Sequence, residues 1–161
     1  MQAIKNFLCH PYKSVDLEAI LSLFYNTVHS INIKDYSQEQ IDVWAAAITD
    51  KDKWAQSLLK NFTYVVEFEG KIVGFGDMTQ EGSLEHLYVD KDFQGFGIAS
   101  LILKAIEQKV HELGLAEITT ESSITARPFF EKRGFIVIKE QQKITRGMSF
   151  LTYIMKKAIS V

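Results

Sequence analysis

The sequence predicts a mixed α/β fold, with a mostly antiparallel sheet of six to seven strands flanked by helices. The first observation is the order of the patterns: a strand, two to three helices, three strands, a helix, a strand, a helix and two closing strands. The second is a hairpin signal, because the β-rich runs 62–68 and 71–78 meet at Glu69-Gly70. A long helix between the runs 84–89 and 117–121 adds one parallel crossover.

The first half of the chain alternates less regularly and is mostly helical. Residues 2–9 are expected to form the first strand. Ser14 or Asp16 can cap a helix that continues to about residue 29, where apolar residues follow a helical spacing. Ser37 and Gln40 have the spacing of a capping box and predict a second helix to about residue 47. A third helical piece is expected over 50–59.

The second half contains the long helix and the closing strands. The helix carries an apolar face from residue 98 to residue 113, and Gly114 is the expected residue just beyond its end. A strand over 117–121, a short helix over 125–133, and two strands over 135–144 and 150–156 complete the prediction.

Composition restricts the class of protein. A chain of 161 residues is long enough for one domain with its own core, so residues 1–161 are expected to form a single domain. A net charge of −2 favours neither a nucleic acid nor an anionic membrane as a partner. Its one cysteine, Cys9, excludes an internal disulfide and is expected in the core of the first strand.

Targeting and metal signals add to this picture. The first residues lack the apolar region of a signal peptide, and no apolar run approaches membrane-spanning length, so a cytoplasmic protein is expected. The four histidines lack the close spacing of metal ligands, which predicts no metal site.

The segment after residue 89 has the features of an anion-binding loop. An apolar strand ends at Val89, and Gln94-Gly95-Phe96-Gly97-Ile98-Ala99 opens the long helix. Backbone N–H groups and the positive end of the helix dipole favour negative charge there, and glycines let a ligand approach the main chain. We expect the pyrophosphate of a cofactor. The order of elements excludes a dinucleotide-binding Rossmann domain, which alternates strand and helix from its start.

Two motifs in this order resemble one enzyme family. Residues 94–99 resemble the Gln/Arg-x-x-Gly-x-Gly/Ala signature of the GCN5-related N-acetyltransferases, the GNAT family. Residues 126–135, Ala-Arg-Pro-Phe-Phe-Glu-Lys-Arg-Gly-Phe, resemble its second motif, Ala-x-x-x-Tyr-Glu-Lys-x-Gly-Phe. The resemblance covers essentially the whole chain, and the segment 25–32 is similar to small bacterial single-domain members. It implies the GNAT fold, acetyl-coenzyme A as cofactor, and acetyl transfer to an amine of a small molecule or a peptide.

The resemblance also implies which residues contact the cofactor. Main-chain groups of the strand before the loop would hold the pantetheine arm; these are Leu87, Tyr88 and Val89. The N–H groups of the loop would take the pyrophosphate; these belong to Gln94, Gly95, Phe96, Gly97, Ile98, Ala99 and Ser100. Ala126, Phe129 and Phe130 would flank the thiol end. Ser123 stands where many members have an asparagine that contacts the cofactor.

The reaction requires a group that removes a proton, because an alkyl ammonium has a pKa of about 10.4 and is not a nucleophile. Glu85 and His86 are the candidates, since they lie just before the cofactor strand. Neighbouring residues of a strand point to opposite faces, so at most one is expected to face the site. Family members often use a glutamate here through a water molecule, which favours Glu85. The backbone N–H near Val89 is the expected donor to the oxyanion.

One position departs from the family pattern. Phe130 replaces the usual tyrosine and cannot donate a proton. Either Tyr88 or Tyr153 takes over, or the thiolate leaves without assistance. The departure keeps two alternatives open: a catalytically weak module that binds coenzyme A and regulates, and an acyltransferase with a different acyl donor or acceptor.

The acceptor region is expected between the first two helices. His29, Asp35 and Tyr36, together with Trp44, combine acidic and aromatic groups that could hold a cationic amine. The competing interpretation is an ordinary helical hairpin with Trp44 packed inside. Arg127, Lys132 and Arg133 either assist a phosphate of the cofactor or form a solvated helix face. A homodimer is compatible with the fold.

Overall fold

A computed structural model describes residues 6–159 and contains a seven-stranded sheet in the order β1-β2-β3-β4-β5-β7-β6. The strands are β1 (Leu8–Pro11), β2 (Phe62–Phe68), β3 (Lys71–Met78), β4 (Ser83–Val89), β5 (Glu117–Ser123), β6 (Ile136–Thr145) and β7 (Met148–Ala158). All neighbouring strands are antiparallel except β4 and β5, which are parallel. The predicted mixed fold with a mostly antiparallel sheet is therefore confirmed.

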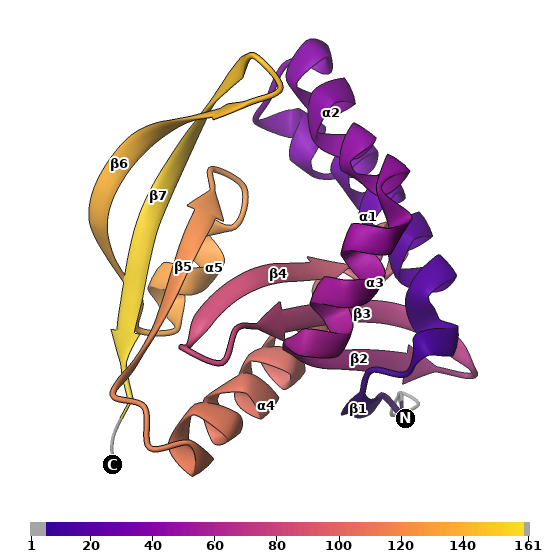
Figure 1. The fold of residues 1–161 in the computed structure, drawn as a ribbon, viewed down its shortest axis with the longest axis vertical. Helices are drawn as coiled ribbons and strands as arrows, with labels where there is room; N and C mark the ends of the chain where they lie inside the picture. Colours follow the sequence, from indigo (N-terminus) through magenta and orange to yellow (C-terminus); the bar gives the residue numbers. More distant parts are fainter. Residues whose placement is uncertain (1–5, 160–161) are drawn as a thin grey trace, which may run out of the picture.

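Five α-helices flank the sheet of the described chain. They are α1 (Leu17–Ser30), α2 (Gln38–Ala45), α3 (Lys51–Lys60), α4 (Ile98–Glu112) and α5 (Arg127–Lys132). Figure 1 shows α4 along one side of strands β2 to β4, with α1 and α3 on the other side and α2 reaching toward β7. The elements match the expected order, and their ends differ by a few residues. Of the expected first strand, residues 2–5 lie outside the described residues.

Local signals fix several of these elements. At the start of α2, Gln40 N–H donates to Ser37 Oγ at 3.1 Å, and Ser37 N–H donates to Gln40 Oε1 at 2.8 Å. This reciprocal pair is the predicted capping box. After α4, Gly114 adopts a φ of +71°, the left-handed conformation that commonly ends a helix.

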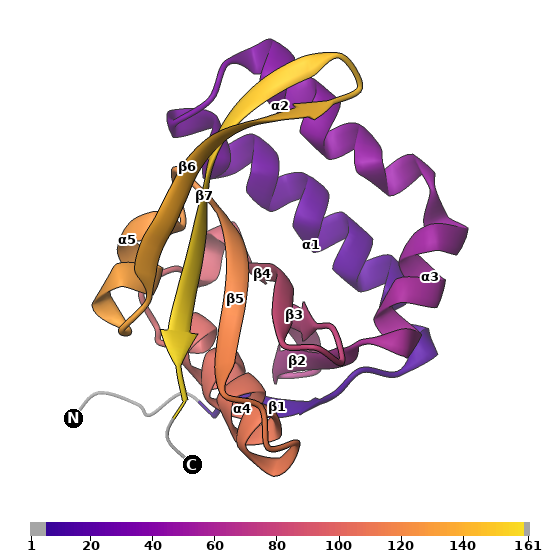
Figure 2. The same ribbon diagram turned by 60° about the vertical axis from the view of Figure 1, so that its left-hand side comes forward.

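The sheet divides between β4 and β5. These two strands pair only where Ser83 and Leu84 meet Thr119 and Thr120. The Thr120 hydroxyl donates to Leu84 O at 3.0 Å, which satisfies the last carbonyl before the strands separate. Beyond this point β4 and β5 diverge, so that β5 to β7 stand apart from β1 to β4 (Figures 1 and 2).

Two hydrophobic cores hold these parts together, one on each face of the sheet. Helices α1 to α3 cover one core, in which Ile20, Phe24 and Phe75 are buried. Helix α4 covers the other, in which Ile102 and Met155 are fully buried. Each core joins side chains from both parts of the sheet: Leu84 and Ile118 belong to the core under α4, and Phe75 and Phe150 belong to the other.

The structure corrects one prediction about the core. Cys9 was expected in the interior, but its side chain is exposed. The reason is the position of its strand, because β1 is an edge strand that pairs only with β2. An edge strand buries fewer of its side chains than a central one. Within the described residues, no helix is long and apolar enough to cross a membrane.

Candidate active site

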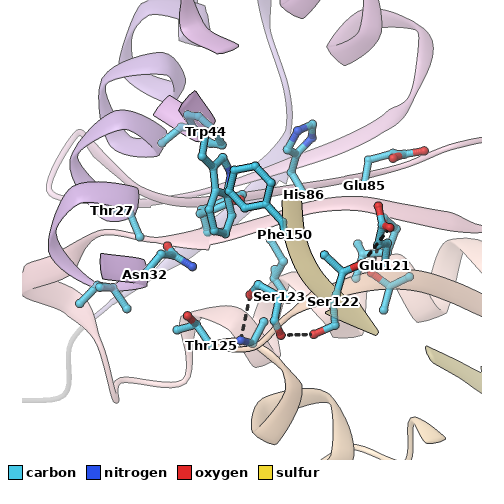
Figure 3. A pocket seen from close by; sticks show the side chains of 18 of the residues that line it. Thr27, Asn32, Trp44, Glu85, His86, Glu121, Ser122, Ser123, Thr125 and Phe150 are labelled. Atoms are coloured by element: carbon cyan, nitrogen blue, oxygen red, sulfur yellow. Dashed lines mark hydrogen bonds between the residues drawn. The ribbon is translucent and has the colours of Figure 1, made fainter. Parts of the chain in front are cut away.

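A cavity of about 640 Å³ opens where β4 and β5 separate. Its floor comes from β4 and β5, one wall from α1 to α3, and the opposite wall from α5 and the β6–β7 hairpin. Figure 3 shows side chains from these elements around one space, with Trp44 beside Phe150. The site is therefore assembled from segments that are distant in the sequence.

A bulge in β4 shapes the floor. Asp77 of β3 pairs with His86, whereas the next residue of β3 pairs with Leu84, so Glu85 is an extra residue on β4. The bulge changes the alternation of side chains, and Leu84 and Leu87 both pack against the core under α4. Glu85 and His86 both line the cavity. Regular alternation is interrupted at the bulge, so the alternation rule does not decide which of the two side chains faces the cavity.

His86 is oriented by a buried carboxylate. Its Nδ1 lies 2.8 Å from Oδ1 of Asp77, a residue with 0% exposure. The other carboxylate oxygen, Oδ2, accepts a hydrogen bond of 2.9 Å from the side-chain amide of Asn61. The His86 side chain keeps 29% of its surface exposed. The imidazole is thus held at one nitrogen and open at the other.

Aromatic rings surround the His86 imidazole. The Trp54 ring lies 4.7 Å from it, centre to centre, and the rings of Phe24, Phe75 and Tyr88 lie 6.1 to 6.3 Å away. Burial raises the pKa of the Tyr88 phenol, which a hydrogen bond from Trp44 only partly offsets. A phenol in this state keeps its proton and is a poor acid toward a thiolate.

The loop before α4 has the geometry of an anion site. Gly95 and Gly97 have φ values of +80° and +81°, and a side chain at either would meet nothing within 4 Å. The helical ladder begins with Leu101 N–H, which donates to Gly97 O at 3.1 Å, so the N–H groups just before it lie at the open end of α4. The Gln94 amide donates to Val89 O at 2.8 Å and holds the loop against the end of β4.

The edge of β4 that faces β5 is available for an extended ligand beyond Leu84. From residue 85 to residue 89, no strand of the described chain pairs with the edge that faces β5. Thr27 of α1 donates its hydroxyl to Val89 O at 3.2 Å and ties the helix to the end of this edge. An unpaired edge of this kind accepts an extended chain through main-chain hydrogen bonds. Leu87, Tyr88 and Val89 all line the cavity beside it.

A cation lies at the same end of α4. The Arg133 guanidinium donates to Ser100 Oγ, with its Nε at 3.0 Å, and stacks 3.9 Å over the Phe129 ring. A positive group near the N-terminus of a helix is electrostatically unfavourable unless an anion joins them. Of the two interpretations of the basic residues 127, 132 and 133, this geometry favours a phosphate contact for Arg133. Arg127 instead pairs with Glu131 at 2.8 Å.

The second-motif helix provides an apolar wall. Phe130 is only 3% exposed, and it lines the cavity together with Ala126 and Phe129. The Ser123 hydroxyl accepts from Ala126 N–H at 3.0 Å, so it stabilises the turn into α5. Tyr153 packs in the core on the α4 side and is not among the residues that line the cavity. It is therefore not positioned to replace the missing tyrosine hydroxyl.

The residues expected to bind the acceptor divide into two groups. Tyr36 lines the cavity with its ring, but its hydroxyl is occupied, since it accepts from Ile124 N–H at 2.8 Å and donates to Leu151 O at 3.0 Å. His29 and Asp35 do not line the cavity. His29 Nδ1 lies 2.9 Å from the carbonyl of the residue four before it, and Asp35 accepts from a threonine hydroxyl at 2.8 Å.

Other residues of this region line the cavity. Trp44, Phe150 and Asn32 line the cavity, and Figure 3 shows the Asn32 amide directed into it. Asn32 is only 5% exposed as a residue, and its side chain lines the cavity. Trp44 therefore forms part of the cavity wall. The sequence allowed either an acceptor-binding residue or a residue packed inside a helical hairpin, and this position has features of both.

A carboxylate on β5 faces β4 across the cavity. Glu121 accepts hydrogen bonds from Lys143 Nζ at 2.9 Å, from Thr152 Oγ1 at 3.1 Å and from the Gln141 amide. Burial acts to raise the pKa of Glu121, but these donors outweigh it and lower the pKa below its usual value. Glu121 therefore stays ionised and bonded, and it supports the β5 wall.

Sequence reasoning missed Asp77 and Asn61, although one signal was present. Asp77 interrupts the apolar run of β3, and a carboxylate in a central strand is rarely buried without a partner. A regular register that continues from the pair Met78–Leu84 would place it opposite residue 85, and the bulge moves its partner to residue 86. Asn61 carries no such signal, because it lies in the short connection between α3 and β2.

The site combines a divided sheet, an open helix N-terminus and an unpaired strand edge. These three features fit a thioester that carries a nucleotide, and they are typical of an acyltransferase fold. Residues 32–157 match the family described as the acetyltransferase (GNAT) domain. The chain is 31% identical over 153 residues to the uncharacterised N-acetyltransferase YafP of Escherichia coli. The matched region covers 95% of this chain and 97% of YafP. The chain belongs to the GNAT acetyltransferase family, whose members transfer an acetyl group from acetyl-coenzyme A.

Solved structures agree with this assignment. A GCN5-related N-acetyltransferase from Rhodopseudomonas palustris superposes with a TM-score of 0.93 at 25% identity and covers 98% of this chain and 99% of that one. The PaiA N-acetyltransferase of Thermoplasma acidophilum, solved with coenzyme A, superposes with a TM-score of 0.78 at 18% identity, over 95% of this chain and 99% of that one. The predicted GNAT fold is confirmed.

Proposed function

We propose that this chain, as one domain over residues 1–161, transfers an acetyl group from acetyl-coenzyme A to a primary amine of a small molecule or a peptide. The amine attacks directly, with both substrates bound at once. The separation of β4 and β5 is the observation that carries this proposal, because it joins the loop before α4 to a cavity of about 640 Å³. A site of that volume accommodates a small amine or an amino-terminal segment.

The residues at the separation fit the cofactor in two ways. Leu87, Tyr88 and Val89 offer an unpaired edge for the amide groups of the pantetheine arm. The loop from Gln94 to Ser100 offers main-chain N–H groups and open space above Gly95 and Gly97 for the pyrophosphate. Arg133 adds a cation at this end. Bound acetyl-coenzyme A supplies an acetyl group activated as a thioester.

The chain's own residues handle the protons and exclude water. An acceptor ammonium must lose a proton before it can react, and Glu85 and His86 both line the cavity to receive it. Trp44, Trp54 and Phe150 provide apolar walls that limit the access of water. Phe130 offers no proton, and Tyr88 keeps its own. We therefore propose that the thiolate leaves without a dedicated acid, which its pKa of about 8.5 permits.

Direct attack predicts a specific kinetic pattern. Initial rates measured against both substrates should give intersecting lines in a double-reciprocal plot, as expected for a ternary complex. Parallel lines would indicate an acetylated enzyme, for which Cys9 is the available thiol. Cys9 lies on the edge strand β1 and does not line the cavity, so Cys9→Ser should leave kcat unchanged.

The same assay separates the proposal from its alternatives. A regulatory module would bind coenzyme A in calorimetry but would release no thiol above background with any amine in a broad panel. An enzyme with another acyl donor would favour a longer acyl-coenzyme A over acetyl-coenzyme A in kcat/KM.

A further inference from the structure

We infer that Asp77 is a positioning residue that makes His86, rather than Glu85, the group that removes the proton from the acceptor amine. The inference rests on the proposed function for its chemistry. The structural part of the inference depends only on the contacts of Asp77. Asp77 does not line the cavity, so it acts only through His86.

The contact between Asp77 and His86 fixes which imidazole nitrogen is free. Asp77 Oδ1 lies 2.8 Å from Nδ1, a distance typical of a charge-assisted hydrogen bond. An ionised carboxylate can only accept, so the proton of a neutral imidazole is held on Nδ1. Nε2 then carries the lone pair. The side chain as a whole lines the cavity, and Nε2 is its nitrogen without a partner in the described residues.

Asp77 itself is fixed from the other side. Asn61 donates to Oδ2 at 2.9 Å, so each carboxylate oxygen has one partner. The carboxylate is fully buried in β3, between Gly76 and Met78, and pairs with no lysine or arginine in the described chain. Burying an anion in this way costs stability, and an apolar residue of similar size would often be more stable. The Asp77 carboxylate is therefore better explained by the orientation of His86 than by a gain in stability.

The proton transfer balances with these groups. The acceptor R–NH₃⁺ gives one proton to Nε2, its N–H bonding pair becomes the lone pair of R–NH₂, and His86 becomes an imidazolium. The Nδ1 proton stays on Nδ1 throughout. The new positive charge forms beside the Asp77 carboxylate, which was the uncompensated charge before the transfer. The protonated state is thus stabilised by a fully buried carboxylate next to it.

Glu85 lacks a comparable arrangement. It is the extra residue of the bulge, it is exposed, and its carboxylate has no hydrogen-bond partner in the described residues. Figure 3 shows Glu85 and His86 leaving β4 in different directions. A carboxylate without a partner is free to move and is well solvated, which makes it a poorly positioned base.

The charged and titratable groups around His86 are few. Asp77 faces it from β3, and Tyr88 and Glu85 lie on its own strand. The other charged or titratable groups that line the same cavity are Tyr36, Glu121, Lys143 and Arg146. The helices on this side contribute the rings of Phe24 and Trp54, which carry no charge. A pH effect that depends on Asp77 can therefore be separated from the effects of these other groups by single substitutions.

The first test needs no turnover. Nitrogen NMR of the imidazole in the native chain, with His86→Gln to assign the signal, should show neutral His86 protonated on Nδ1. A signal that places the proton on Nε2 would overturn the inference, whatever the activity.

The second test uses the pH profile of kcat/KM with an active amine. In Asp77→Asn we expect a loss of about 100-fold near pH 7, together with a shift of the rising limb to lower pH, because the charge that stabilises the imidazolium is gone. The dissociation constant for coenzyme A should not change. Glu67→Gln is the matched control: it removes the carboxylate 3.0 Å from His10 Nε2 on the edge of the sheet and should leave the profile unchanged.

These outcomes distinguish the two claims. An Asp77→Asn variant that keeps the native profile and rate would overturn the role of Asp77. If that variant fails to fold, the NMR measurement on the native chain decides. A native chain that turns over no amine would contradict the proposed function, while the tautomer would still report on the Asp77–His86 geometry.

Discussion

The pyrophosphate site can be tested by a pair of substitutions at Gly97. Gly97 lies directly before α4 and has a φ of +81°. A side chain at this position costs about 1–2 kcal/mol of backbone strain and meets no atom within 4 Å. Aspartate and asparagine have nearly the same shape and tolerate this conformation better than other residues. They differ in one negative charge. Comparing Gly97→Asp with Gly97→Asn therefore removes the backbone cost and leaves the electrostatic effect.

The size of that effect follows from the proposed position of the phosphates. Two like charges about 4 Å apart repel by about 1 kcal/mol in water and by about 4 kcal/mol at an effective dielectric constant near 20. Gly97 is exposed, so the lower value applies to each of the two pyrophosphate charges, or about 2 kcal/mol in all. We expect Gly97→Asp to bind coenzyme A about 30-fold more weakly than Gly97→Asn in calorimetry. The ratio should fall as salt is added. Equal affinities would refute the placement of the pyrophosphate.

Three further substitutions test separate parts of the account. Arg133→Gln should weaken coenzyme A binding about tenfold in calorimetry, because a charge-assisted contact is lost, and unchanged affinity would return Arg133 to a structural role. Tyr36→Phe should lower the free energy of unfolding in urea by about 1–3 kcal/mol, since two buried backbone groups lose their partner, whereas a loss near zero would contradict that bridge. Glu121 has a lowered pKa, so its stabilising contribution is present above the unfolded pKa and is lost as pH falls through the folded one. The stability difference between the native chain and Glu121→Gln should therefore shrink between about pH 5 and pH 3, and a constant difference would contradict the assignment.

Short-range chemistry made much of the fold predictable. The capping box at Ser37 and Gln40 involves residues three apart, and the hairpin at Glu69-Gly70 needs only its two turn residues. The loop with Gly95 and Gly97 is equally local, because strand, glycines and helix follow one another directly. Such features depend on neighbours in the sequence, which a single sequence displays.

The geometry of the candidate site depends on contacts between distant residues. The bulge at Glu85 appears only when the register of β3 against β4 is known, and it interrupts the alternation of side chains along β4. Tyr36 is a suitable residue type for an acceptor site, but its hydroxyl bonds to the main chain of Ile124 and Leu151. These partners lie 88 and 115 positions further along the sequence. No local pattern reports a hydrogen bond of that range.

The position of an element within the sheet also lay beyond the sequence. Cysteine is a residue type that is usually buried, yet Cys9 is exposed because its strand lies at the edge of the sheet. His29 lies at the end of α1 and turns its ring toward Tyr25, 4.3 Å away, instead of the cavity. In both cases the residue type was informative and the direction of the side chain was set by tertiary packing.

The central claim is that the cavity between β4 and β5 joins an acetyl group to an amine. The most direct measurement is the incubation of the purified chain with isotopically labelled acetyl-coenzyme A and a broad panel of primary amines, followed by mass spectrometry of products and protein. The account predicts label on the nitrogen of at least one amine, with one equivalent of free thiol for each label and none on Cys9. Tight binding of coenzyme A without label on any amine would contradict it.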